Sequence, residues 1–212
     1  MKHFHPRKSD VGQPVELKAP SKPTALSSWD DPKQLATVTP DGPCPPTLNG
    51  IVFADWAAAP TTAAGWEDQV ALHAATFTEP PMATAAGKEP ASGVVIFEAD
   101  GRVWVVSPSN AFGGYVNTFP KGKLDIYLTL RANALKEGYE ECGLQVALTG
   151  FLCDSHRSTS VTRYYTAKRI GGHPARMCWE TQAVHLVPRA ELAKFISHKN
   201  DQVIAQALQA LN

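Results

Sequence analysis

The sequence has little cysteine and no long apolar run. Its four cysteines (Cys44, Cys142, Cys153 and Cys178) lack the CxxC spacing of metal and redox motifs and are too sparse for a disulfide scaffold. We therefore expect reduced thiols and a cytoplasmic protein. No stretch approaches the roughly 20 apolar residues of a membrane-spanning helix. The basic first residues lack the apolar run of a secretory signal, so we expect none there.

The sequence also lacks an excess of charge of either sign. It has 20 Lys and Arg and 20 Asp and Glu, so its formal net charge is zero. No global field attracts nucleic acid or an anionic membrane, and an anionic ligand must be bound by local charges. Hydrophobic residues make up 43% of the chain, enough for a sizeable core, which excludes wholesale disorder. A globular protein of one or two domains is expected.

Composition divides the chain into three parts. Residues 1–48 hold nine of the 17 prolines, which indicates an extended arm or a mobile tail. Residues 49–90 form an N-terminal extension of unknown role, with a helix expected over 65–75. This extension is either a small subdomain that packs on the main body, or a dimer contact or lid over a ligand. Residues 91–212 are expected to form the main domain.

The main domain shows strand and helix patterns in alternation. Asp100-Gly101 separates two β-rich runs within 92–108 and predicts a two-residue hairpin loop. A helix is expected from Thr129 to Cys142, with Gly143 ending it in a left-handed conformation. Strands mixed with a few helices favour an α/β sandwich over a doubly wound parallel sheet. Further strands are expected at 144–153, 161–170 and 181–187, and helices at 189–196 and 201–211.

Three carboxylates share one face of the expected helix. Glu137, Glu140 and Glu141 are spaced three and four residues apart, so they point the same way and repel one another. They lie in the last turns, where the negative end of the helix dipole disfavours anions. A divalent cation would remove this repulsion, and oxygen ligands suit Mg²⁺ or Mn²⁺.

The segment from Gly122 to Leu144 resembles the Nudix box. That pattern reads Gly, five residues, Glu, seven residues, Arg-Glu, an apolar residue, any residue, Glu-Glu, any residue, Gly and an apolar residue. The chain keeps six of these nine positions and departs at Leu128, Lys136 and Gly138. The positions kept are Gly122, Glu137, Glu140, Glu141, Gly143 and Leu144.

The resemblance implies a Nudix α/β/α sandwich with a mixed sheet. It implies a metal-dependent pyrophosphohydrolase that cleaves the diphosphate bond of a nucleoside diphosphate derivative such as ADP-ribose. Glu137, Glu140 and Glu141 would be metal ligands and catalytic residues, and Gly122 would offer a backbone oxygen to the metal. Glu180 would act as an external base. The cofactor would be Mg²⁺ or Mn²⁺.

The departures from the box point to an altered metal site. Leu128 cannot bind a metal, and Lys136 keeps the positive charge of the arginine but loses its bidentate fork. These two residues favour an alternative, a catalytically impaired Nudix-fold protein that binds or senses a nucleotide. Retention of all three helix glutamates favours the enzyme.

Glu137, Glu140 and Glu141 are called the glutamate stripe below. Residues that could contact the substrate are expected outside it. Lys121, Arg131 and Arg163 are the candidates for phosphate contacts. Phe119 is among the candidates for contact with a base or ribose, with Asn117, Tyr164 and Tyr165. The expected partner is a small nucleotide, with neither a membrane nor nucleic acid, and a homodimer remains an alternative.

Overall fold

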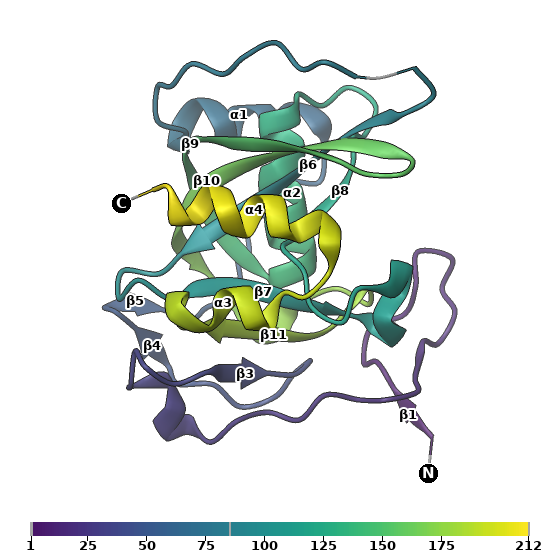
Figure 1. Cartoon of the computed structure of the whole chain (residues 1–212). Coiled ribbons are helices and arrows are strands. Elements are labelled where there is room, and N and C mark those ends of the chain that lie inside the picture. Colours follow the sequence, from purple (N-terminus) through teal and green to yellow (C-terminus); the bar gives the residue numbers. More distant parts are fainter. Residues whose placement is uncertain (1, 85, 212) are drawn as a thin grey trace.

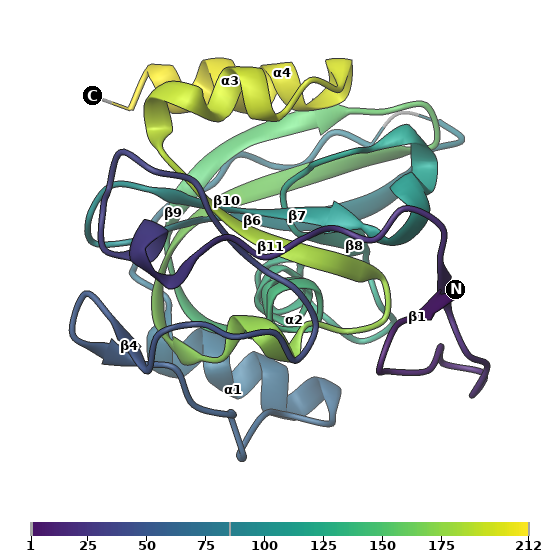
Figure 2. The ribbon, with the colours of Figure 1, turned by 90° about the horizontal axis from the view of Figure 1, so that it is seen from below.

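A mixed seven-stranded sheet lies between two layers of helices in the computed structural model, which describes residues 2–84 and 86–211 (Figure 1). Figure 2 shows α3 and α4 on one face of the sheet and α2 on the other, with α1 outside α2. The predicted α/β/α sandwich is confirmed. The helices are α1 (Ala63–His73), α2 (Leu130–Cys142), α3 (Leu192–Phe195) and α4 (Lys199–Gln209).

The strands follow the order β3-β11-β7-β6-β10-β9, with β8 paired to β6. Only the β6–β10 pairing is parallel among the described strands of this sheet. The strands of the sheet are β3 (Ala36–Val38), β6 (Glu89–Phe97), β7 (Val103–Pro108), β8 (Lys121–Lys123), β9 (Leu144–His156), β10 (Ser160–Gly172) and β11 (Thr181–Val187). Two small hairpins are formed by β1 (His3–Phe4) with β2 (Glu16–Leu17) and by β4 (Thr47–Leu48) with β5 (Ile51–Val52).

Helix α2 begins and ends as its sequence predicts. The Thr129 hydroxyl accepts a hydrogen bond from the backbone N–H of Ala132 (3.2 Å), which satisfies one of the free donors of the first turn. Gly143 follows the helix with φ 68°, a conformation that glycine adopts without steric cost. Tyr139 points to α1, where its ring meets Trp66 and Trp56 at centroid distances of 6.0 and 5.2 Å.

The loop between β6 and β7 has three residues rather than the two predicted. Glu98 and Arg102 close the hairpin through a backbone hydrogen bond of 2.9 Å, which leaves Ala99, Asp100 and Gly101 in the loop. The Gly101 N–H donates to the Glu98 carbonyl (3.0 Å), and Gly101 has φ 86°. A type I turn followed by a left-handed residue is the usual three-residue hairpin, and it uses the same Asp-Gly pair.

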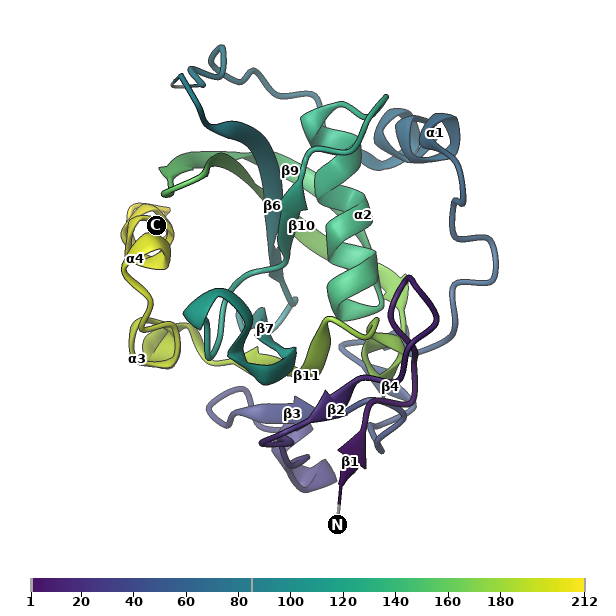
Figure 3. The ribbon, with the colours of Figure 1, turned by 90° about the vertical axis from the view of Figure 1, so that its right-hand side faces the viewer.

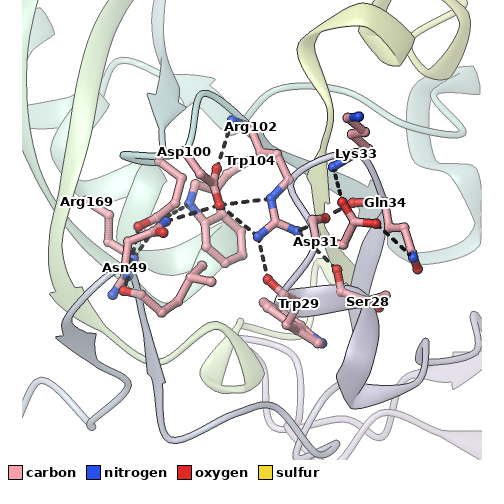
Figure 4. Close-up of polar contacts among 12 residues, drawn as sticks. Ser28, Trp29, Asp31, Lys33, Gln34, Asn49, Asp100, Arg102, Trp104 and Arg169 are labelled. Atoms are coloured by element: carbon pink, nitrogen blue, oxygen red, sulfur yellow. Dashed lines mark hydrogen bonds and ion pairs between the residues drawn. The ribbon is translucent and has the colours of Figure 1, made fainter.

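Part of the proline-rich segment joins the main sheet. Strand β3 pairs antiparallel with β11, an edge position that proline-rich sequence tolerates. Trp29, from the turn before β3, is fully buried, and the buried Arg102 guanidinium donates to its carbonyl oxygen (2.6 Å). Figure 4 shows Arg102 between this turn and Asp100. The division of the chain into three parts, with boundaries after residues 48 and 90, stays a prediction.

No helix in the described part of the chain is both long and apolar enough to cross a membrane.

Candidate functional site

Helix α2 places Glu137 and Glu141 beside the short strand β8. Glu137 is buried, and its carboxylate lies against Gly122, where a Cβ atom would overlap it. The Lys121 N–H donates to Glu141 Oε2 (3.1 Å). A side chain at position 122 would therefore displace the Glu137 carboxylate. The packing of α2 on β8 brings Gly122 against Glu137, although fourteen residues separate them in the chain.

Burial and mutual repulsion disfavour the charged forms of two of these glutamates. Burial raises the pKa of Glu141 to about 7, against the opposing effect of Lys121. Burial, followed by the charges of Glu141 and Glu140, raises the pKa of Glu137 well above its usual value. The site thus holds negative charge that its own environment does not fully neutralise.

Lys136 neutralises the third glutamate. Its ammonium nitrogen lies 2.6 Å from Glu140 Oε2 and 3.0 Å from Asp125 Oδ2. Burial alone would lower the pKa of Lys136, but the hydrogen bonds to both carboxylates raise it above its usual value. Lys136 is therefore a fixed cation that bridges the loop before α2 to Glu140.

Glu180 lies near these carboxylates on the loop Cys178–Thr181. The Cys178 N–H donates to the carbonyl of Glu140 at the end of α2 (2.7 Å). Burial and then the charges of Asp10 and Glu140 raise the pKa of Glu180. The structure therefore places the predicted external base next to the glutamate stripe.

Lys121 is the one predicted substrate contact that lies at the stripe. Its backbone N–H binds Glu141, and its ammonium nitrogen lies 5.0 Å from the centre of the Tyr115 ring. The prediction for Phe119 is corrected, because this residue is fully buried and packs edge-on against Tyr164 (6.1 Å between centroids). A side chain within the core cannot stack on a substrate.

Arg131 and Arg163 are at the other end of α2. Arg131 lies in its first turn, about 13 Å along the axis from Glu140. Both arginines bind the Glu79 carboxylate, at 2.7 and 3.1 Å, and Arg163 also forms a bidentate pair with Asp154. They line a cavity of about 510 Å³ between α1 and β10. Their role as phosphate contacts stays a prediction, and both guanidinium groups are already paired with carboxylates.

Two residues of the site were missed by sequence reasoning. One of them is Asp125, which binds Lys136. Asp10 accepts a hydrogen bond from Trp179 Nε1 (2.9 Å), beside Glu180. In the sequence, the opposite charges of Asp125 and Lys136, eleven residues apart, are only a weak indication of this pair. Nothing in the sequence linked Asp10 to residue 179.

The donor set fits a divalent cation by its chemistry. Carboxylate oxygens suit Mg²⁺ and Mn²⁺, and bound positive charge would offset the repulsion that raises the pKa of Glu137. Within residues 2–84 and 86–211, no three His, Cys, Asp or Glu side chains are gathered closely enough to hold a metal ion. Binding a cation would therefore require the glutamate side chains to converge.

Comparison with known proteins gives a family match and several structural likenesses. The model of the NUDIX domain matches residues 87–208. No curated protein matches the chain. A NUDIX hydrolase from Nitrosomonas europaea is 16% identical with a TM-score of 0.48, over 57% of this chain and 86% of that one. The NUDIX domain of Shewanella oneidensis NrtR, solved with ADP ribose, is 22% identical with a TM-score of 0.48, over 59% and 89%.

Proposed function

Because the chain belongs to the Nudix family, whose domain model covers residues 87–208, we propose that it cleaves the diphosphate bond of a nucleoside diphosphate derivative with Mg²⁺ or Mn²⁺. The observation that carries this proposal is the position of Glu137 and Glu141 against β8, with Glu180 on the neighbouring loop. Burial and repulsion raise the pKa of all three carboxyls. Such a site favours a ligand that brings positive charge.

Each side chain has a role in the proposed reaction. Glu137, Glu140 and Glu141 would hold the cation, which when bound neutralises the charge of the diphosphate and positions it for attack. The Glu180 carboxylate accepts a proton from the attacking water, and its raised pKa brings it closer to neutral pH. Lys121 offers its ammonium group to a phosphate oxygen at the edge of β8.

A panel of nucleoside diphosphate derivatives, ADP-ribose included, tests this proposal. Hydrolysis is measured with Mg²⁺, with Mn²⁺ and with a chelator, in the wild type and in Glu140→Gln. We expect metal-dependent turnover of at least one compound and a loss of at least 100-fold in the variant. Glu191→Gln is the matched control, because Glu191 is exposed and pairs with the exposed Lys194. Full activity of Glu140→Gln would refute the assignment.

A second function, nucleotide binding without turnover, is favoured by one observation. The Lys136 ammonium group already forms an ion pair with the Glu140 carboxylate. At position 128, where the box pattern has a glutamate, Leu128 packs against the core. The positively charged Lys136 side chain competes with a metal ion for the Glu140 carboxylate. A nucleotide that raises the thermal unfolding temperature, with no hydrolysis product in the presence of either metal ion, would identify this function.

A further inference from the structure

The N-terminal arm, residues 3–18, lies outside the matched domain but beside its carboxylates. Strands β1 and β2 form the base of the arm, and the connection between them is its tip. Figure 3 shows this tip next to the end of α2 that is closer to β11. Asp10, in the tip, bonds to Trp179 on the loop that carries Glu180.

Two elements of the Nudix domain hold the loop Cys178–Thr181 through its backbone. From α2, the Glu140 carbonyl accepts the Cys178 N–H (2.7 Å). From the end of β7, the Ser109 N–H donates to the Glu180 carbonyl (2.7 Å), and the Ser109 hydroxyl donates to the Trp179 carbonyl (2.7 Å). These bonds leave the Trp179 side chain and the Thr181 carbonyl to other partners.

The arm supplies those partners. Trp179 Nε1–H donates to Asp10 Oδ1 (2.9 Å). The buried His5 ring places Nε2 3.1 Å from the Thr181 carbonyl. The Arg7 N–H donates to His5 Nδ1 (3.0 Å), so Nε2 carries the proton and donates to Thr181. The loop is thus bonded to the arm on both sides of Glu180.

The arm is itself fixed and can therefore position the loop. Asn110 has φ 56°, a left-handed conformation that is uncommon for residues other than glycine. Its side-chain amide donates to the Glu16 carbonyl (2.9 Å) and accepts from the Lys18 N–H (2.8 Å). Arg7 pairs with Asp41 at 2.8 Å. Asn110 and Arg7 thus join the arm to the rest of the fold at two places.

We propose that Asp10 is a positioning residue of the hydrolytic reaction. Through Trp179, and with His5 on the other side, it holds Glu180 facing the carboxylates of α2. This inference rests on the proposed function. It extends the active site to residues that precede the family domain. Among the described residues, Asp10 is the one hydrogen-bond partner of the Trp179 side chain.

Removal of the Asp10–Trp179 bond from either side tests the inference. Asp10→Ala and Trp179→Phe should each lower kcat about tenfold and change KM less than twofold, because the base is displaced without loss of a substrate contact. The double variant should be no worse than either single variant, since both remove one interaction. Asp10→Asn keeps an oxygen that accepts from Trp179, so it should restore most of the activity.

Lys2→Ala is the matched control, because it removes an exposed ion pair to Glu16 of the arm without touching the loop. It should leave kcat unchanged. Amide hydrogen exchange at residues 178–181 should be faster in Asp10→Ala than in the control. Wild-type kcat and unchanged exchange in Asp10→Ala, or additive effects in the double variant, would overturn the inference.

The two possible failures look different. If the inference alone is wrong, the wild type is active, Glu140→Gln is inactive and Asp10→Ala keeps full kcat. If the proposed function is wrong, the wild type shows no metal-dependent turnover, and the role of Asp10 in that reaction is refuted with it.

Discussion

At the scale of single residues, the stripe on α2 places charge where burial opposes it. The pKa of Glu141 in the folded chain is about 7, against 4.5 for an ordinary glutamate. A carboxyl with a raised pKa stabilises the fold at low pH, and this contribution is lost as the pH rises from about 4.5 through 7. The ionised glutamates therefore lower the stability of the metal-free protein at neutral pH.

We predict that Glu141→Gln stabilises the metal-free protein at pH 7.5. The free energy of unfolding should rise by on the order of 2 kcal/mol, because the amide carries no charge and still accepts from the Lys121 N–H. Denaturant titration in chelator measures this, and the gain should shrink towards pH 4.5. Glu191→Gln, on an exposed residue, should show no gain. Equal stability of Glu141→Gln and wild type at pH 7.5 would contradict the prediction.

The buried His185 has the opposite pH dependence. Its ring lies between the Thr37 and Ser107 hydroxyls, 2.8 Å from each, and burial lowers its pKa to about 4. The unfolded chain binds a proton near pH 6.5, so stability falls as the pH drops from 6.5 to 4. We predict a loss of about 3 kcal/mol from this group. His185→Gln should remove this part of the dependence of the free energy of unfolding on pH. Denaturant titrations at pH 7, 5.5 and 4.5 measure it.

Helix periodicity predicted which glutamates share a face, because i, i+3 and i+4 positions are fixed by geometry. The family, the enzyme class of a Nudix-type hydrolase and the fold class are confirmed. The roles of Arg131 and Arg163 could not be predicted, because their partner Glu79 lies more than 50 residues away in the chain. Pairing across such a separation leaves no local pattern.

At the scale of elements, α2 packs unusually close to β6. A Cβ atom on Gly138 would lie 3.1 Å from Val94 Cγ1, which explains why the apolar residue of the box pattern is absent here. A glycine inside a helix also costs about 1 kcal/mol of helix propensity relative to alanine. The close contact with the sheet gives the glycine a packing role.

Two substitutions at Gly138 should therefore differ in effect. Gly138→Ala gains about 1 kcal/mol of helix propensity and loses a similar amount as Val94 shifts, so its free energy of unfolding should stay within about 1 kcal/mol of wild type. Gly138→Val should lose about 2 kcal/mol or more, because two further methyl groups must enter a filled interface. Denaturant titration compares the three proteins. Equal stability of all three would show that α2 can move away from the sheet.

At the scale of the whole molecule, the core extends beyond the matched domain. Trp29 packs against Phe53 and Trp104 with ring centroids 5.9 and 6.1 Å apart, and only Trp104 belongs to residues 87–208. The proline count predicted an arm or tail for residues 1–48. It could not predict that one tryptophan would anchor this segment, because burial of Trp29 depends on the distant β7.

We therefore predict that residues 87–212 do not fold to the native state on their own. Without the first 86 residues, Trp104 and the β11 edge are uncovered, and burial of one tryptophan alone is worth about 3 to 5 kcal/mol against a total stability of about 5 to 15. Full-length Trp29→Ala should lose about 3 to 5 kcal/mol, whereas Lys2→Ala should lose less than 1. Near-UV circular dichroism and denaturant titration measure both. A cooperative transition in the truncated chain would show that the domain is independent of the segments that precede it.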